Sequence, residues 1–206
     1  MEGSSTPKTF ARYSAVELKM TEKDGIAVFV DRDGTICFDR HYLSDPNGLE
    51  LIPTVAEGIK RLNDAKLTVI VVTNQSGVRR GYFTEETLKT IHDRLRQILA
   101  SHGAKIDDIF YCPHRPDEGC KCRKPAPGML IQAKDKHGFD LTRSFVIGDR
   151  MMDVGMAHAV GAKGILVPEP GDQYDIEKEI RESTTKPDFR ADTFMQAVDW
   201  IINNYA

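Results

Sequence analysis

Two aspartates that directly follow an apolar run are the residues best suited to chemistry in this chain. The run at residues 26–30 leads into the sequence D-R-D-G-T, which begins at Asp31. Because Asp31 and Asp33 are two residues apart, both side chains leave the same face of an extended chain and could meet one cation. Two carboxylates this close repel each other unless a metal ion or a shared proton lies between them. The motif therefore predicts an acidic site, with a surface Asp/Gly turn as the simplest alternative.

Other apolar runs in the chain also end in polar residues. The residues that follow the three clearest runs are Asp31 and Asp33, then Thr73 and Asn74, then Asp149 and Asp153. Apolar runs without alternation are typical of parallel strands covered on both faces. Because the carboxyl ends of parallel strands meet at one edge of a sheet, we expect these side chains to lie together. Lys124, which precedes a predicted helix, would supply a cation to the acidic site.

Phosphoryl transfer is the chemistry that such an assembly suits, because positioning and charge neutralisation are the protein's main contributions to it. We assign Asp31 as a nucleophile that forms an aspartyl-phosphate, which divides one difficult step into two. Asp33 would protonate the leaving oxygen and then take a proton from the hydrolytic water. Thr73 and neighbouring amides would hydrogen-bond the phosphoryl oxygens, while Lys124 offsets the charge of the transition state.

The same carboxylates predict a magnesium site. Mg²⁺ is bound by oxygen atoms, and we assign it to Asp31, the backbone carbonyl of Asp33 and Asp149, with waters completing the set. Asp153 is expected to lie behind these ligands and to orient them. Each residue taken alone has a simpler explanation, such as a capped turn or a solvated helix start. Four such motifs in one chain make coincidence rare.

A second metal site is predicted between residues 112 and 122. Cys112 and His114 are followed by Cys120 and Cys122. Three thiolates and one imidazole in a closed set of four favour tetrahedral Zn²⁺, with buried or idle thiols as the alternative. Because four ligands leave no open position, this zinc is expected to be structural. It would hold the two basic residues that follow Cys122 at the phosphate site.

The motifs D-R-D-G-T, T-N-Q-S-G and C-x-H-x-x-x-x-x-C-x-C-R-K-P together resemble those of one protein family. They are similar to the D-glycero-D-manno-heptose-1,7-bisphosphate 7-phosphatases and their relatives, the histidinol-phosphate phosphatases, within the haloacid dehalogenase (HAD) superfamily. The resemblance spans roughly residues 26–167. It implies a small Mg²⁺-dependent phosphatase that has no cap domain, is stapled by zinc and is typically monomeric.

The substrate prediction depends on three arginines. A bisphosphate needs a second anion site, and Arg79, Arg80 and Arg123 could form one through forked contacts, with Asn74 also assigned to substrate binding. Solvated surface arginines are the alternative. Two positions depart from the family pattern. Cys37 stands where an asparagine is usual, and Arg79 stands where a small residue is common; both flank the expected substrate pocket.

Two other functions stay open at this stage. Histidinol phosphate carries a cationic amine and an imidazole, which carboxylates such as Asp39, Asp45 or Asp117 would serve better than arginines. A protein of another class, a zinc-stapled phosphate-binding module, could keep the fold without the activity. The intact pair of Asp31 and Asp33 argues against that module.

Composition and element order complete the prediction. The 206 residues are 40% hydrophobic and 29% charged, with a net charge of −3, which argues against a general nucleic-acid binder. No apolar run reaches a membrane span of about 18 residues, and the four cysteines suit ligands better than disulfides, so we expect a cytoplasmic enzyme of a phosphorylated sugar. Alternating strands and helices predict an α/β fold with a three-layer, doubly wound, mainly parallel sheet.

The predicted boundaries are as follows. Residues 1–23 form a loose arm, and residues 24–206 form a single phosphatase domain. Strands are expected at 26–30, 67–72, 109–111, 144–147 and 164–167. Helices are expected at 54–65, opened by a capping box of Thr54 and Glu57, and at 84–102, 128–136, from after Asp153 to Gly161, and 193–204. Residues 168–188 are expected to be a surface excursion.

Overall fold

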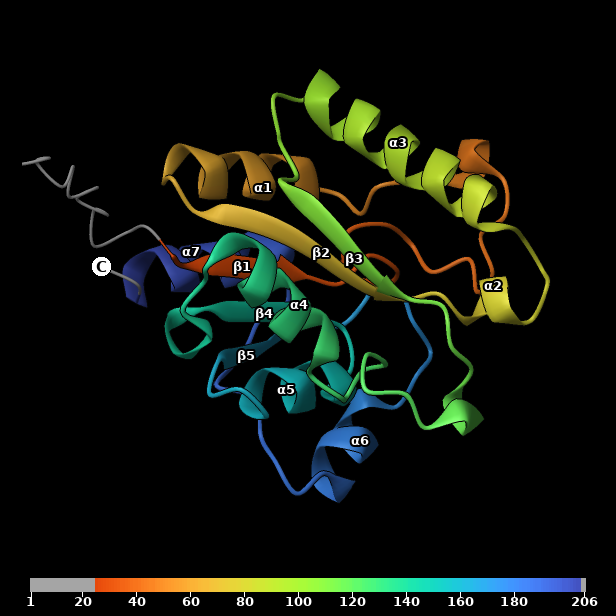
Figure 1. The fold of residues 1–206 in the computed structure, drawn as a ribbon. Coiled ribbons are helices and arrows are strands. Elements are labelled where there is room, and N and C mark those ends of the chain that lie inside the picture. The colour runs from red at the N-terminus through yellow and green to blue at the C-terminus, as the bar shows by residue number, and fades with distance from the viewer. Residues whose placement is uncertain (1–24, 205–206) are drawn as a thin grey trace, which may run out of the picture.

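A computed structural model describes residues 25–204 of the protein. A parallel sheet lies at the centre of the fold (Figure 1). The strands are β1 (Ala27–Val30), β2 (Thr68–Asn74), β3 (Asp108–Cys112), β4 (Phe145–Gly148), β5 (Lys163–Leu166) and β6 (Phe189–Arg190). The helices are α1 (Val55–Asp64), α2 (Ser76–Arg79), α3 (Glu85–Ser101), α4 (Gly128–His137), α5 (Met151–His158), α6 (Ile176–Glu182) and α7 (Phe194–Asn204). The predicted α/β class is therefore confirmed.

The strand order places β1 and β4 side by side in the middle of the sheet. The order is β3-β2-β1-β4-β5-β6, and every pairing is parallel. The chain builds outward from β1 through β2 to β3, then returns to β4 and builds outward in the other direction. The carboxyl ends of β1 and β4 therefore form the crevice at which ligands bind in sheets of this kind.

Helices cover both faces of the sheet, as a doubly wound fold requires (Figure 1). Val28 and Val30 of β1 face one way and belong to a core that includes buried residues of α1, α3 and α7. Ala27 and Phe29 face the other way, toward buried residues of α4 and α5. Because both faces of β1 are buried, the strand reads as an unbroken apolar run.

Helices α1 and α7 approach each other closely at Gly58. A Cβ atom built on Gly58 would lie 2.6 Å from Cδ1 of Phe194, which is itself buried. We expect Gly58→Ala to lower the free energy of unfolding by about 1–3 kcal/mol, because overpacking outweighs the gain in helix propensity. Urea denaturation measures this loss. The exposed neighbour Glu57→Ala is the control and should shift stability by less than about 1 kcal/mol, so equal effects would contradict the packing account.

Two of the predictions about element boundaries differ from the structure. The capping box at Thr54 is wrong, because Thr54 has a φ of 69° and its side chain makes no cap hydrogen bond, although α1 still begins at Val55. The region 168–188 is more than a surface excursion, because it contains α6. That short helix packs Ile176 and Ile180 against a small apolar cluster beneath α5. Its charged sequence hid this apolar pair from the periodicity analysis.

The N-terminal arm predicted at residues 1–23 lies outside the described residues. The division into an arm and a single domain therefore stays a prediction. Between residues 25 and 204, none of the helices combines the length and the apolar character that crossing a membrane requires.

Candidate active site

Four buried charged side chains meet at the crevice between β1 and β4. Asp31 follows β1, Asp149 follows β4, and Asp153 lies in the first turn of α5. Lys124 arrives from the loop before α4 and is 3% exposed, whereas Asp31 is 8% exposed. The Nζ atom of Lys124 lies 2.6 Å from Oδ2 of Asp31 and 2.7 Å from Oδ1 of Asp153. The sequence prediction that these residues converge is confirmed by this geometry.

Burial makes the charges of this cluster depend on one another. Burial raises the pKa of Asp31 to about 7, opposed by Lys124 and assisted by the charge of Asp153. Burial also raises the pKa of Asp149 to about 8, with further contributions from Asp31 and Asp153. Burial lowers the pKa of Lys124, but the carboxylates of Asp153 and Asp31 outweigh it and raise that pKa. Three carboxylates thus face two cations, Lys124 and Arg150, and this surplus of negative charge favours a further positive charge here.

A magnesium ion fits this donor set. One carboxylate oxygen each from Asp31, Asp149 and Asp153 lies within 4.8 Å of the others. Oxygen donors with surplus negative charge are what Mg²⁺ requires. Gly34, with a φ of +78°, leaves room for the site, because a Cβ atom there would lie 2.6 Å from Oδ2 of Asp149. Only glycine can both adopt that backbone conformation and clear the carboxylate.

Asp33 is held apart from the metal cluster by its own hydrogen bonds. Arg32 donates from Nε to Oδ1 of Asp33 at 3.0 Å and from Nη2 to Oδ2 at 2.7 Å. The Nε2 atom of Gln75 donates to Oδ2 at 2.8 Å and to Oγ1 of Thr73 at 2.8 Å. The hydroxyl of Thr73 lies 3.5 Å from Oδ2 of Asp33. The predicted residues Asp33 and Thr73 are thus adjacent, at the carboxyl ends of β1 and β2.

Sequence reasoning left two of these contacts unassigned. Gln75 is buried and bridges Asp33 and Thr73, and its place inside the T-N-Q-S-G motif was the available signal. Arg32 is 1% exposed although it lies between two aspartates. Cys37, which departs from the family pattern, is a buried thiol. Its Sγ lies 3.5 Å from the carbonyl of Arg32, and burial raises its pKa.

The four predicted zinc ligands form one cluster. The Sγ atom of Cys122 lies 3.2 Å from Sγ of Cys112 and 3.5 Å from Sγ of Cys120, and Nδ1 of His114 lies 3.2 Å from Sγ of Cys122. The thiols are free, and these separations approach the edges of about 3.8 Å in a tetrahedron of Zn–S bonds. The donor set therefore fits Zn²⁺ closely.

The cysteine cluster is fastened directly to the active site. Cys112 ends β3 and pairs in register with Asn74 of β2. The backbone N–H of Lys124 donates to Oδ1 of Asn74 at 3.1 Å. The loop therefore leaves the sheet at Cys112 and returns to it at Lys124, two residues after the last thiol.

The three predicted anion-binding arginines gather around the cysteine loop. Arg79 is exposed and lies 3.3 Å from Oε2 of Glu118. Arg123 is half-buried and donates from Nη1 to the carbonyl of His114 at 3.3 Å. Arg80 is exposed. A hydrogen bond from Arg115 is the main cause that lowers the pKa of Asp117, and the positive charge of Arg80 adds to it. The arginines lie near one loop, although carboxylates already neutralise part of their charge.

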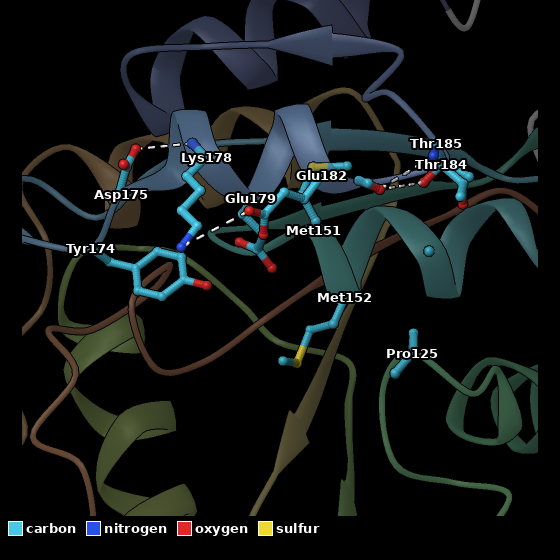
Figure 2. Close-up of a pocket in the computed structure, with 12 residues that line it drawn as sticks. Pro125, Met151, Met152, Tyr174, Asp175, Lys178, Glu179, Glu182, Thr184 and Thr185 are labelled. Atoms are coloured by element: carbon cyan, nitrogen blue, oxygen red, sulfur yellow. Dashed lines mark hydrogen bonds and ion pairs between the residues drawn. The ribbon is translucent and has the colours of Figure 1, made fainter.

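Two pockets flank the acidic cluster. A pocket of about 250 Å³ is lined by Asp39, Tyr42, Asn74 and Gln75 among others, and so opens beside the predicted substrate residues. A larger pocket of about 700 Å³ lies between α5 and α6 (Figure 2). Its lining residues Met152 and Pro125 point toward it, but none of the predicted site residues lines it. The smaller pocket is therefore the one that adjoins the predicted site residues.

The segment after β5 folds back over the active site. Arg150 lies 3.0 Å from Oδ2 of Asp149 and 2.7 Å from Oδ2 of Asp172, and its guanidinium lies 3.8 Å from the ring centre of Tyr174. The Oε1 atom of Glu169 accepts a hydrogen bond from the backbone N–H of Asp39 at 3.2 Å. Part of the predicted surface excursion thus forms a wall of the site.

The doubly wound sheet with an acidic crevice defines a hydrolase of the HAD-like class. A family model described as "HAD-hyrolase-like" matches residues 121–197. The chain is 40% identical over 158 residues to a D-glycero-beta-D-manno-heptose-1,7-bisphosphate 7-phosphatase of Pseudomonas aeruginosa, covering 76% of this chain and 89% of that protein. It is 36% identical over 191 residues to the D-glycero-D-manno-heptose-1,7-bisphosphate 7-phosphatase of Thermosynechococcus vestitus, covering 87% and 97%.

A solved structure that is similar to this chain has the same activity in its name as these sequence relatives. The crystal structure of the D,D-heptose 1,7-bisphosphate phosphatase from B. bronchiseptica, complexed with magnesium and phosphate, has a TM-score of 0.78 and 31% identity. The aligned region covers 86% of this chain and 98% of the chain in that structure. The chain belongs to the D-glycero-D-manno-heptose-1,7-bisphosphate 7-phosphatase family.

Proposed function

We propose that this protein is a Mg²⁺-dependent phosphomonoesterase that removes the 7-phosphate from D-glycero-D-manno-heptose 1,7-bisphosphate. The observation that carries the proposal is the convergence of Asp31, Asp149, Asp153 and Lys124 in one buried cluster between β1 and β4. The named activity of the family supports the substrate class.

The reaction proceeds in two steps on Asp31. Its carboxylate attacks phosphorus, the bond between phosphorus and the sugar oxygen breaks, and Asp33 gives its proton to that oxygen. Water then attacks the aspartyl-phosphate and passes a proton to the Asp33 carboxylate, which releases inorganic phosphate and restores both side chains. Lys124 offsets the negative charge that builds up on the phosphoryl oxygens, and Thr73 donates a hydrogen bond to them.

Two metal ions complete this proposal. Mg²⁺ would be held by Asp31, the backbone carbonyl of Asp33 and Asp149, with Asp153 behind them, and would neutralise phosphoryl charge. Zn²⁺ would be held by the four residues of the cysteine cluster and would fix the loop that carries Arg123 and Lys124. The monomeric state and the cytoplasmic location stay predictions.

A phosphate-release assay tests the reaction class. Nitrophenyl phosphate should be hydrolysed in the presence of Mg²⁺, and chelation of the metal by EDTA should reduce the rate by at least about 100-fold because surplus carboxylate charge then repels the phosphate. Restoring Mg²⁺ should restore the rate. Absence of release under every metal condition would favour a zinc-stapled binding module instead.

The second phosphate of the substrate is proposed to bind near the cysteine loop. We expect Arg123→Ala to raise KM for the heptose bisphosphate about tenfold and to leave KM for nitrophenyl phosphate almost unchanged, because only the bisphosphate reaches the guanidinium. Steady-state kinetics measure both. The exposed Arg143→Ala is the control, and an equal rise for both substrates would argue against a second anion site.

Histidinol phosphate is the second candidate substrate, and one observation favours it. Asp39 lines the pocket beside Asn74, where it could accept a cationic amine. The other carboxylates considered for this role do not line that pocket. Asp45 caps the turn Pro46–Gly48, and Asp117 pairs with Arg115 at 2.7 Å. Measuring kcat/KM for heptose bisphosphate and histidinol phosphate side by side decides between them.

A further inference from the structure

A buried arginine separates the two aspartates of the first motif, and each of its three guanidinium nitrogens makes a hydrogen-bond contact. Arg32 is 1% exposed and grips Asp33 through both Nε and Nη2, at 3.0 and 2.7 Å. A forked contact of this kind fixes the plane of the carboxylate as well as its distance. The orientation of the Asp33 carboxylate therefore depends on where the guanidinium of Arg32 is held.

The remaining nitrogen of that guanidinium meets a histidine from α3. Nη1 of Arg32 lies 3.3 Å from Nε2 of His92, sixty positions along the chain. A guanidinium can only donate hydrogen bonds, so Nε2 must accept and His92 must be neutral with its proton on Nδ1. Burial, followed by the positive charge of Arg32, lowers the pKa of His92 to about 3, which agrees with a neutral ring.

His92 is placed firmly enough to act as a support. It is 7% exposed and projects from the same side of α3 as the core residues Leu88, Ile91 and Leu95. Its ring lies 6.0 Å from the ring of Tyr111 on β3. A polar side chain on a buried helix face is costly unless it is hydrogen-bonded, and its contact with Arg32 supplies that bond. Among residues 25–204, Asp33 and His92 are the side chains that accept from Arg32.

We propose that His92 is a positioning residue of the phosphatase, which acts through Arg32 to hold the carboxyl group of Asp33 where it can protonate the leaving oxygen. The inference rests on the proposed function of Asp33. Removing the acceptor of His92 leaves a buried N–H of Arg32 without a partner, so the guanidinium is free to turn toward other acceptors. Asp33 then loses its fixed orientation although it keeps its contact with Gln75.

The test compares two leaving groups. A sugar alkoxide is a poor leaving group that needs a proton, whereas nitrophenolate leaves readily without one. kcat/KM covers the steps up to loss of the leaving group, so it isolates the proton donation by Asp33. We expect His92→Phe to lower kcat/KM by about tenfold to a hundredfold for the heptose bisphosphate and by less than about threefold for nitrophenyl phosphate. His92→Gln, whose amide oxygen can accept from Arg32, should recover most of the loss.

The controls separate the possible failures. His102→Phe replaces an exposed histidine at the end of the same helix and should change neither rate. Equal losses of His92→Phe on both substrates, or no loss on either, would overturn the positioning role. Should His92→Phe fail to fold, His92→Ala is assayed with and without added imidazole, and recovery limited to the heptose substrate supports the proposal. Failure of both variants to fold would assign His92 to stability instead, whereas an inactive wild-type protein would refute the phosphatase function itself.

Discussion

Replacing Asp31 with asparagine is expected to abolish turnover and to leave the fold intact. The amide has the shape of the carboxyl group but cannot attack phosphorus, so kcat should fall by about 10⁴-fold or more, on the scale seen when a covalent nucleophile is removed. Wild-type protein quenched in acid during turnover should carry phosphate on Asp31 by mass spectrometry. Asp31→Asn should carry none.

The stability of Asp31→Asn follows from the direction of the pKa shift. Burial raises the folded-state pKa of Asp31 to about 7, above its unfolded value of 3.8, so ionisation of this group destabilises the fold as pH rises between those values. A neutral amide removes that cost, while Lys124 keeps Asp153 as a partner. The melting temperature of the metal-free variant at pH 7 should therefore equal or exceed that of the wild type.

Two outcomes would count against this reading of Asp31. Substantial activity of Asp31→Asn would refute the covalent route. Unfolding of the variant, monitored by circular dichroism, would mean that the carboxylate holds the fold together. Asp64→Asn on the surface of α1 is the matched control and should behave as wild type in both measurements.

Replacing Cys120 with serine is expected to release the zinc ion. Serine does not supply a thiolate, and three remaining ligands hold Zn²⁺ far more weakly than four. Elemental analysis should give about one zinc per wild-type chain and close to none in Cys120→Ser. Because the loop carries Arg123 and Lys124, kcat/KM should fall by about tenfold to a hundredfold, the range found when groups that orient a site are removed.

Cys37→Ser provides the control for metal content. Cys37 is a buried thiol beside Arg32 and is absent from the cysteine cluster, so its replacement should leave zinc unchanged. Unchanged zinc in Cys120→Ser would contradict the tetrahedral site. A loss of zinc with full activity would instead show that the metal does not shape the phosphate site.

The sequence predicted the elements that carry the site because apolar runs mark both the strands and their ends. Asp31 and Asp149 were expected together since each follows a parallel strand, and β1 and β4 are neighbours in the sheet. The cysteine cluster was predictable because its four ligands lie close together along the chain. Strand β6 was missed because two residues carry almost no periodic signal.

Contacts between distant side chains could not be predicted in this way. Nothing in the local pattern around His92 indicates Arg32 as its partner, because a polar residue on a helix face can equally point to solvent. The false cap at Thr54 has a related cause. Its side chain type suits a helix start, but Thr54 has a left-handed backbone, whereas a capping residue usually has an extended one, and its hydroxyl makes no cap hydrogen bond.

The central pairing of β1 with β4 also bears on when activity arises during synthesis. Asp31 donates its backbone N–H to the carbonyl of Ile147 at 2.9 Å, so the two halves of the acidic crevice come from segments more than a hundred positions apart. Long-range pairing of this kind is slow to form, and it needs the second partner to have left the ribosome. A nascent chain that ends before β4 would therefore bind neither cation nor phosphate at the crevice.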